Sequence, residues 1–297
     1  MEKIDFCTIM TPTYNRGYII TNLYKSLKKQ TCKSFEWLVI DDGSTDNTED
    51  IFKNLIHDDD FKIRYYKVEN GGKHRAINFA LDKAKGEYFF IVDSDDQLTE
   101  NAIEIVLKWF NTIKESSEFA GIGGLRQYSD GNIIGSTFYG DFLDCTSLER
   151  KKNNILGDKA EVFYTKILKM NKFPEISGEK FLSESVVWNK IAKSGLKIRW
   201  FNQAIYTCDY LNDGLTKNLL YHHANSPVGF SLYLLTVIND EKVSKIRELY
   251  YYGMYSKLTS INDDKVSNLL KTKKINVKFG KFLYFIISNL KKIKKTG

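Results

Sequence analysis

Short apolar runs alternate with amphipathic segments along the first part of the chain. The runs are rich in β-branched and aromatic residues, which predicts buried strands over 6–10, 36–40, 63–68 and 88–92. Between them, apolar residues recur at helical spacing. This predicts helices over 19–30, from a cap at Ser44 or Asp46 to 56, and over 75–85 with Gly86 as the terminating glycine. Strands recurring about every 25–30 residues with helices between them indicate βαβ units and a mainly parallel sheet.

The second half of the chain predicts further strands and then helices. Strands are expected over 119–128 and 133–138, joined by a hairpin turn, and over 160–167 and 197–211. Ser183 is a candidate cap for a helix that runs to Lys193 and ends at Gly195. After a turn at 212–216, helices are expected over 229–237, 244–258, 264–270 and 279–295. The expected division is an α/β domain over 1–215 and a helical region over 216–297.

Polar, turn-forming residues follow each of the first four predicted strands. They occupy 11–16, 41–45, 70–73 and 93–96. Taken alone, each is ordinary turn chemistry, because Asp, Gly, Asn and Ser favour turns for backbone reasons. The carboxyl ends of parallel strands, however, meet at one edge of a sheet, where ligands bind in such folds. Four polar loops at the same strand end therefore predict one shared ligand site.

Three carboxylates, those of Asp93, Asp95 and Asp96, follow the strand predicted over 88–92. Alternation along an extended chain points Asp93 and Asp95 the same way, about 6–7 Å apart. Like charges this close repel unless a cation lies between them, and oxygen ligands suit Mg²⁺ or Mn²⁺. The alternative is a solvated acidic turn before a helix that starts near Thr99. The position after a buried strand favours the metal.

Charge is unevenly distributed along the 297 residues. The net charge is +7, yet the segment 271–297 holds nine lysines and no acid, so the preceding 270 residues carry −2. This argues against a nucleic-acid-binding body. The tail over 279–295 mixes apolar residues, among them Phe282, Phe285 and Ile286, with lysines, which is typical of a basic amphipathic helix on an anionic membrane surface. A helix packed on the domain with a solvated lysine face is the alternative.

Cysteine usage and the N-terminus bear on the compartment. The four cysteines are far apart and form no C-x-x-C pair, as expected of reduced thiols in a cytosolic protein. Glu2, Lys3 and Asp5 stand where a secretory signal would need an apolar segment, and no run approaches the roughly 18 apolar residues of a spanning helix. We expect a cytoplasmic protein, located at the inner face of the plasma membrane if its tail binds lipid.

The four polar loops also carry a family resemblance. Their sequences are Thr11-Pro12-Thr13-Tyr14-Asn15-Arg16, Val39-Ile40-Asp41-Asp42-Gly43-Ser44-Thr45-Asp46, Asn70-Gly71-Gly72-Lys73 and Asp93-Ser94-Asp95-Asp96. In order and spacing they resemble family 2 glycosyltransferases, more loosely those of bacterial capsule and surface polysaccharide synthesis. The resemblance implies an α/β GT-A (Rossmann-like) fold with a nucleotide-sugar half over about 1–115 and an acceptor half over about 116–215. It also implies inverting, metal-dependent transfer from a nucleotide-diphosphate sugar, with a UDP-sugar as the expected donor, to a glycan or lipid-linked glycan.

By the same resemblance, individual residues receive roles. Asp95 is assigned to the metal, and Asp93 to the metal or the ribose. The remaining residues assigned to the nucleotide are Thr11, Thr13, Tyr14, Arg16, Asp42, Lys73 and Ser94, with Asp41 a weaker choice. A metal that holds the diphosphate would stabilise the departing negative charge. Lys73 is alternatively a solvated loop lysine.

Inverting transfer also needs a carboxylate that takes the proton of the acceptor hydroxyl. In the family this base is an acid at the start of a helix in the second half, which points to Glu184 first and Glu179 second. An acid that complements a helix dipole is the alternative for Glu184. His222 lies near where some GT-A enzymes supply a metal ligand, although a loop histidine without such a role is equally compatible. Trp188 is interpreted as a core residue rather than a sugar-stacking one.

Two other classes of protein stay open. A nucleotidyltransferase or dinucleotide-binding dehydrogenase would share the α/β pattern, but the first βα loop lacks G-x-G-x-x-G. A non-catalytic subunit that binds a nucleotide sugar would have the same polar loops but would catalyse no sugar transfer. Donor sugar, acceptor, linkage and oligomeric state depend on geometry that the sequence does not reveal.

Overall fold

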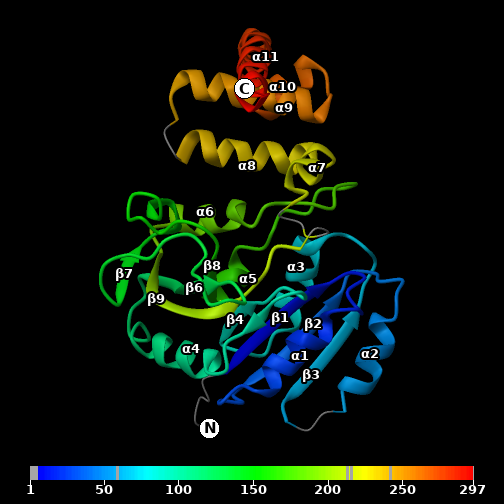
Figure 1. Ribbon diagram of the computed structural model, residues 1–297, viewed down its shortest axis with the longest axis vertical. Helices are drawn as coiled ribbons and strands as arrows, with labels where there is room; N and C mark the ends of the chain where they lie inside the picture. Colours follow the sequence, from blue (N-terminus) through cyan, green and yellow to red (C-terminus); the bar gives the residue numbers. More distant parts are fainter. Residues whose placement is uncertain (1–5, 58–59, 212–213, 215–216, 241–242, 297) are drawn as a thin grey trace. The chain divides into compact units, whose positions relative to one another are not determined.

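The computed structural model describes residues 6–57, 60–211, 214, 217–240 and 243–296, with side chains as far as residue 290 (Figure 1). The chain forms two compact units. The first comprises Met1–Phe173 and Val187–Asp209, and the second Pro174–Val186 and Tyr210–Gly297. The segment Pro174–Val186 thus groups with the C-terminal helices, which differs from a simple division at residue 215.

A single nine-stranded sheet runs through the first unit. Its strands are β1 (Cys7–Thr13), β2 (Phe35–Asp41), β3 (Lys62–Lys67), β4 (Tyr88–Ile91), β5 (Gln97–Leu98), β6 (Phe119–Gln127), β7 (Phe142–Cys145), β8 (Lys159–Tyr164) and β9 (Lys197–Thr207). The order is β3-β2-β1-β4-β8-β6-β9-β5, with β7 on β9. The four strands β3-β2-β1-β4 are parallel, as predicted. The other half is mixed, because β8 runs antiparallel to both β4 and β6.

Helices cover both faces of the parallel half. They are α1 (Ile20–Lys28), α2 (Thr48–Leu55), α3 (Lys73–Lys83) and α4 (Ala102–Asn111); α5 (Thr165–Met170) and α6 (Ser185–Lys193) follow later in the chain. One core cluster joins α1, α2 and α4 to alternate residues of β1, β2 and β4, while α3 packs against β1 and β2. The predicted α/β class, with helices around a central sheet and a helical C-terminal part, is confirmed.

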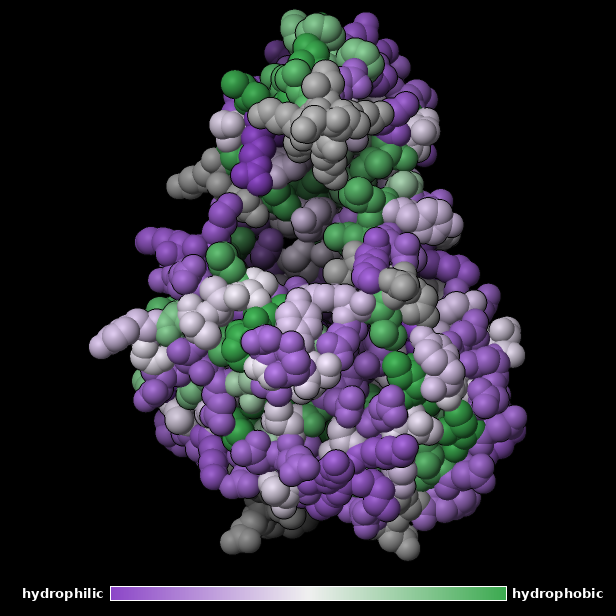
Figure 2. Space-filling view, viewed as in Figure 1, coloured by the Kyte–Doolittle hydropathy of each residue, from purple (hydrophilic) through white to green (hydrophobic). Residues whose placement is uncertain are grey.

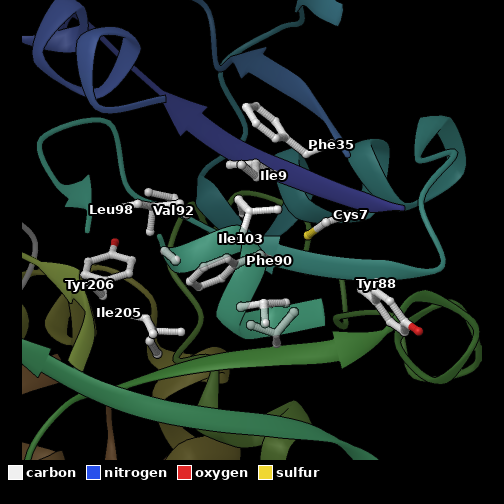
Figure 3. Close-up of a cluster of buried hydrophobic side chains, with 14 of the residues drawn as sticks. Cys7, Ile9, Phe35, Tyr88, Phe90, Val92, Leu98, Ile103, Ile205 and Tyr206 are labelled. Atoms are coloured by element: carbon white, nitrogen blue, oxygen red, sulfur yellow. The ribbon is translucent and has the colours of Figure 1, made fainter. Parts of the chain in front are cut away.

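Apolar side chains gather inside this unit, while much of the visible surface is hydrophilic (Figure 2). The side chains of Ile9, Phe90, Val92 and Ile103 converge between β1, β4 and α4 (Figure 3). Tyr206 lies at the edge of the same cluster, with its ring in the core and its hydroxyl at one end. A tyrosine buried this way needs a polar partner for that hydroxyl, and the partner lies in the candidate site.

Three local expectations are corrected. The strand predicted over 6–10 continues to Thr13, so Thr11 and Thr13 belong to β1 rather than to a loop. The hairpin partner predicted over 133–138 is reduced to a single bridge between Gln127 and Ile133. Gly86 does not end α3 with a left-handed turn; a Cβ there would lie 2.4 Å from the backbone nitrogen of Thr8. Its lack of a side chain lets the chain approach β1 closely.

A buried carboxylate joins several elements at the opposite end of β2 from the polar loops. Glu36 accepts hydrogen bonds from the hydroxyl of Thr8 (2.7 Å), the backbone N–H of Lys85 (2.9 Å) and the guanidinium of Arg64 (2.9 Å). Its side chain is 1% exposed and that of Arg64 14% exposed. This pair is therefore shielded from water, unlike the lysine–carboxylate pairs on the surface.

We expect Glu36→Ala to lower the free energy of unfolding by about 3 kcal/mol, because it leaves Arg64 and the two other donors without their buried acceptor. Urea unfolding would measure this loss. The matched control is Glu49→Ala, which removes the exposed pair with Lys67 and should leave the unfolding midpoint nearly unchanged. Equal midpoints for the two variants would refute the role of Glu36.

The second unit is a set of helices with its own core. Its helices are α7 (Leu219–Ala224), α8 (Pro227–Asp240), α9 (Lys245–Thr259), α10 (Asp263–Leu269) and α11 (Lys274–Thr296). Its core residues are Phe230, Leu234, Tyr252, Tyr255, Val266, Leu270 and Val277. The predicted turn at 212–216 lies outside the described residues except for Gly214. None of the helices in the described part of the chain combines the length and apolarity that crossing a membrane requires.

Two glycines bring α9 and α11 together. A Cβ on Gly253 would lie 2.0 Å from the carbonyl oxygen of Gly280, and one on Gly280 would lie 2.4 Å from that of Leu249. Backbone therefore meets backbone at this crossing, where no larger residue fits without moving a helix.

Candidate active site

The first two polar loops are joined by hydrogen bonds at the carboxyl ends of β1 and β2. Asn15 has a positive φ of 52°. Its backbone N–H donates to Ser44 Oγ (2.8 Å), and its side-chain oxygen accepts from the backbone N–H of Thr45 (2.8 Å). Asp46 accepts from the backbone N–H of Gly17 (2.9 Å). The two loops therefore form one rigid edge of the sheet.

The two acids that follow β2 both bind within the protein. Asp41 is fully buried, and its carboxylate accepts from the backbone N–H of Ser44 (2.7 Å) and from the hydroxyl of Tyr65. Asp42 accepts from the backbone N–H groups of Gly71 (2.7 Å) and Gly72 (2.8 Å). This places the glycine loop, and with it the start of α3 at Lys73, against the second loop.

The remaining capacity of Asp42 is small. A carboxylate has about four lone-pair positions, and the side-chain amide of Asn70 takes a further one at 3.2 Å. Gly72, with φ 94° and ψ 158°, adopts a conformation open to glycine alone. The observed contacts of Asp42 thus position the loop that leads to Lys73. A contact between Asp42 and a nucleotide base stays a prediction.

Three carboxylates and three cations alternate beyond β4. Lys73 Nζ lies 2.6 Å from Asp93, Arg16 lies 3.8 Å from Asp95, and Arg126 lies 3.9 Å from Asp96. The cations come from three different strand ends or helix starts: the β1 loop, α3 and β6. The structure therefore brings together Arg16, Lys73, Asp93 and Asp95, which the sequence placed in one site.

Arg126, Asp96 and Tyr206 are members of this cluster that received no role from the sequence. The Tyr206 hydroxyl donates to Asp96 (2.7 Å) and accepts from the backbone N–H of Asp93 (3.0 Å). The guanidinium of Arg126 lies 4.1 Å from the centre of the Tyr206 ring. An arginine in an otherwise apolar, glycine-rich strand is the one signal that could have indicated Arg126.

The three carboxyl groups differ in acidity. Burial acts to raise the pKa of Asp93, but the charges of Lys73 and Arg126 outweigh it and lower that pKa. Burial, together with the negative charge of Asp93, raises the pKa of Asp95. The same two causes raise the pKa of Asp96 to about 8. Burial and the charge of Asp93 thus both oppose a further negative charge on Asp95 and Asp96, and a cation bound beside Asp93 and Asp95 would lower that cost.

Asp93 and Asp95 fit a divalent cation whose remaining coordination positions are filled by substrate phosphates and water. Within the described residues, no group of three or more His, Cys, Asp or Glu side chains could hold a metal. Mg²⁺ and Mn²⁺ are, however, commonly held by one or two carboxylates together with substrate phosphates and water. The oxygen-only donors and the mutual repulsion of the two acids meet that requirement.

The other residues assigned to the nucleotide occupy different environments. Thr11 is fully buried, and its hydroxyl accepts from the indole of Trp37 (2.9 Å), so this side chain serves the core. The hydroxyl of Thr13 is buried and has no hydrogen-bond partner in the described part of the chain. Tyr14 is 49% exposed, and Ser94 is buried. Tyr14 is thus exposed at this edge, whereas Thr13 contributes a buried hydroxyl that lacks a partner in the described part of the chain.

Glu179, the second candidate base, lies in the second unit and caps a helix there. Its two oxygens accept from the backbone N–H groups of Val228 (2.7 Å) and Gly229 (2.8 Å), at the first turn of α8. It is 7% exposed. This geometry favours a structural cap over a catalytic base, because the carboxylate is held by two amides and shielded from solvent, and the role of Glu179 as the second candidate base stays a prediction.

Glu184 and His222 also belong to the second unit. Glu184 is partly buried directly before α6, the helix start that the sequence predicted. The ring of His222 stacks on Phe181 (5.4 Å between centroids). His223 is buried against Phe230 (4.4 Å), and burial lowers its pKa to about 4, so it is a core residue. The roles of Glu184 as base and of His222 as metal ligand stay predictions.

Trp188 belongs to the first unit and packs inside it. Its ring stacks on Phe163 (4.4 Å) and meets Phe173 edge-on (5.8 Å). These contacts favour the core interpretation over a sugar-stacking surface.

Comparison with known proteins identifies the fold and the family. Among solved structures, S. aureus TarS 1–349 in complex with UDP-GlcNAc aligns with a TM-score of 0.64 at 18% identity, covering 96% of this chain and 92% of that one. The mannosyltransferase PcManGT from Pyrobaculum calidifontis, in complex with GDP-Man and Mn²⁺, aligns with a TM-score of 0.58 at 16% identity, covering 98% and 88%. The fold is the GT-A fold of glycosyltransferases.

Sequence relatives lead to the family itself. The family model for glycosyl transferase family 2 matches residues 8–157. Glycosyltransferase GlyG of Streptococcus pneumoniae is 30% identical over 215 residues, which cover 68% of this chain and 70% of the relative. The GalNAc(5)-diNAcBac-PP-undecaprenol beta-1,3-glucosyltransferase of Campylobacter jejuni is 28% identical over 192 residues, covering 63% and 59%. The chain belongs to glycosyltransferase family 2, as the four loop motifs predicted, and this membership replaces the nucleotidyltransferase and dehydrogenase alternatives.

Proposed function

We propose that this chain is an inverting, metal-dependent glycosyltransferase that acts in the cytoplasm in bacterial surface polysaccharide synthesis. It transfers one sugar from a nucleotide-diphosphate donor, with UDP as the nucleotide, to a hydroxyl of a glycan or a lipid-linked glycan. The observation that carries the proposal is the cluster of Arg16, Lys73, Asp93 and Asp95 at the carboxyl ends of the strands. The C. jejuni relative, named for a polyprenol-linked acceptor, supports the acceptor class.

In this proposal the donor's diphosphate lies beside the charge cluster. Lys73 and Arg16, which hold Asp93 and Asp95 at 2.6 and 3.8 Å, would turn to the phosphate oxygens. Thr13 and Tyr14 supply polar contacts for the nucleoside, and Ser94 lies in the same loop. Asp42 keeps the lysine loop in place and is the proposed contact for the base, and Asp41 fixes the turn behind it.

Asp93 and Asp95 would hold the divalent metal, with Asp93 also within reach of the ribose. When bound, such a cation stabilises the negative charge that develops on the departing diphosphate. Arg126 and Tyr206 then keep the third acid, Asp96, turned away from the metal. His222 is retained as a candidate further ligand.

Glu184 is the proposed base. It would accept the proton of the acceptor hydroxyl as that oxygen attacks the anomeric carbon, while the bond from the anomeric carbon to the diphosphate breaks on the opposite face. One displacement of this kind inverts the configuration of the sugar. Glu179 is the weaker candidate because each of its oxygens already accepts a backbone N–H at the start of α8.

Thermal shift against UDP, GDP, CMP and NAD⁺, each with and without Mn²⁺, tests the donor class. We expect UDP to raise the melting temperature by several degrees at about 100 times its dissociation constant, and Mn²⁺ to increase that shift. A response to GDP alone would keep the transferase and change the nucleotide. The absence of any nucleotide response from the folded chain would reject the proposed donor site.

A further inference from the structure

The last helix, α11, exposes a row of large apolar side chains. Ile275, Phe279, Phe282, Ile286 and Leu290, here called the apolar stripe, follow one another at intervals of four, three, four and four residues. They are 53%, 61%, 65%, 37% and 55% exposed. This spacing places all five on one face of the helix. In Figure 2, green side chains reach the surface in the part that Figure 1 draws in orange and red.

The apolar stripe is not the face by which α11 packs in its own unit. Val277 and Gly280 are the buried positions, and Gly280 meets the backbone of α9. The helix therefore has one apolar face that is satisfied within the unit and a second that is not. The sequence left two alternatives for the tail: a helix packed within the protein, or an amphipathic helix with a free apolar face. The structure shows that one side of α11 is packed and that another side carries the free apolar face.

A row of lysines runs beside the apolar stripe. Lys274, Lys278 and Lys281 each directly precede a residue of the stripe. Lys274 pairs with Asp264 (2.7 Å) and Lys281 with Asp263, while Lys278 has no acidic partner in the described part of the chain. The segment 271–297 contains nine lysines and no acid. The described part of α11 thus combines an exposed apolar face with neighbouring lysines, in a segment whose sequence is strongly basic.

We propose that α11 binds the surface of an anionic lipid bilayer. The helix would lie parallel to the membrane plane, with the apolar stripe at the boundary between headgroups and acyl chains and the lysines at the lipid phosphates. A second copy of the chain is a poorer occupant, because it would bring two lysine-rich helices together. The inference stands on α11 alone and does not depend on the proposed transfer reaction.

Co-sedimentation of the full chain with vesicles tests this surface. In about 0.1 M salt, we expect binding to vesicles of equal parts phosphatidylglycerol and phosphatidylcholine and little binding to phosphatidylcholine alone. The variant Phe279→Ser/Phe282→Ser/Ile286→Ser should lower the affinity for the anionic vesicles about tenfold or more. Lys278→Glu should lower it several-fold through charge alone. The matched control, Tyr139→Ser/Met170→Ser, removes two exposed apolar residues of the first unit and should bind as the parent does.

Undiminished vesicle binding by the triple variant, with circular dichroism like that of the parent, would overturn the proposal. So would the absence of binding to anionic vesicles by the parent chain. Sedimentation equilibrium provides the third outcome: a dimer of the parent that the triple variant abolishes would assign the apolar stripe to a second copy instead.

Discussion

Asp95→Asn should reduce sugar transfer by about a thousandfold or more while the chain stays folded. The substitution keeps the size of the side chain but removes one of the two carboxylates proposed to hold the cation, next to the half-buried Asp93. Transfer from a radiolabelled UDP-sugar, followed as a function of Mn²⁺ concentration, would measure the loss. The increase in UDP-dependent melting temperature caused by Mn²⁺ should disappear in the same variant.

The matched control for this experiment is Asp82→Asn. Asp82 is a 60% exposed carboxylate of α3 that pairs with Lys172 (2.5 Å) on the surface of the same unit, and its loss should leave both transfer and the Mn²⁺ response unchanged. Unaltered transfer by a folded Asp95→Asn protein would remove the metal assignment.

Glu184→Gln should lower turnover by about 10²–10⁴-fold without changing the thermal shift caused by UDP. The amide is nearly isosteric but cannot take the proton of the acceptor hydroxyl. Single-turnover kinetics with saturating donor and acceptor would isolate the chemical step from binding.

Glu179→Gln is the informative comparison for the choice of base. Its amide cannot accept from both Val228 and Gly229, so the expected defect is a lower melting temperature with turnover per folded molecule preserved. The reverse outcome, lost turnover in Glu179→Gln and normal turnover in Glu184→Gln, would return the base to Glu179.

The parallel half of the fold could be predicted because each of its signals is local. Apolar runs, helical spacing and loop composition identified β1–β4 and α1–α3 to within a few residues. The antiparallel placement of β8 and the position of β7 on β9 depend on contacts between residues far apart in the chain. No pattern within either strand reveals its partner.

The residues of the candidate site likewise divide into those that local motifs predict and those that only contacts between distant parts of the chain reveal. Asp93, Asp95, Arg16 and Lys73 were recognisable from motifs next to strand ends. Arg126 stands out only as a charged residue in a mostly apolar strand and Tyr206 not at all, and the role of both follows from their contacts with Asp96. The internal use of Thr11 by Trp37 and of Asp42 by the glycine loop was likewise invisible, since residue type does not show which partner a polar group has.

The crossing of Gly253 and Gly280 determines more than the distance between two helices. Because the two backbones touch at this point, α11 cannot rotate about its long axis without driving a side chain of Asn276, Val277 or Leu283 into α9. The directions in which the described side chains of α11 point are consequently set by two positions that carry no side chain at all. A last helix attached by long, flexible side chains could roll and cover its phenylalanines, whereas this contact holds Phe279 and Phe282 on the exposed face that they occupy.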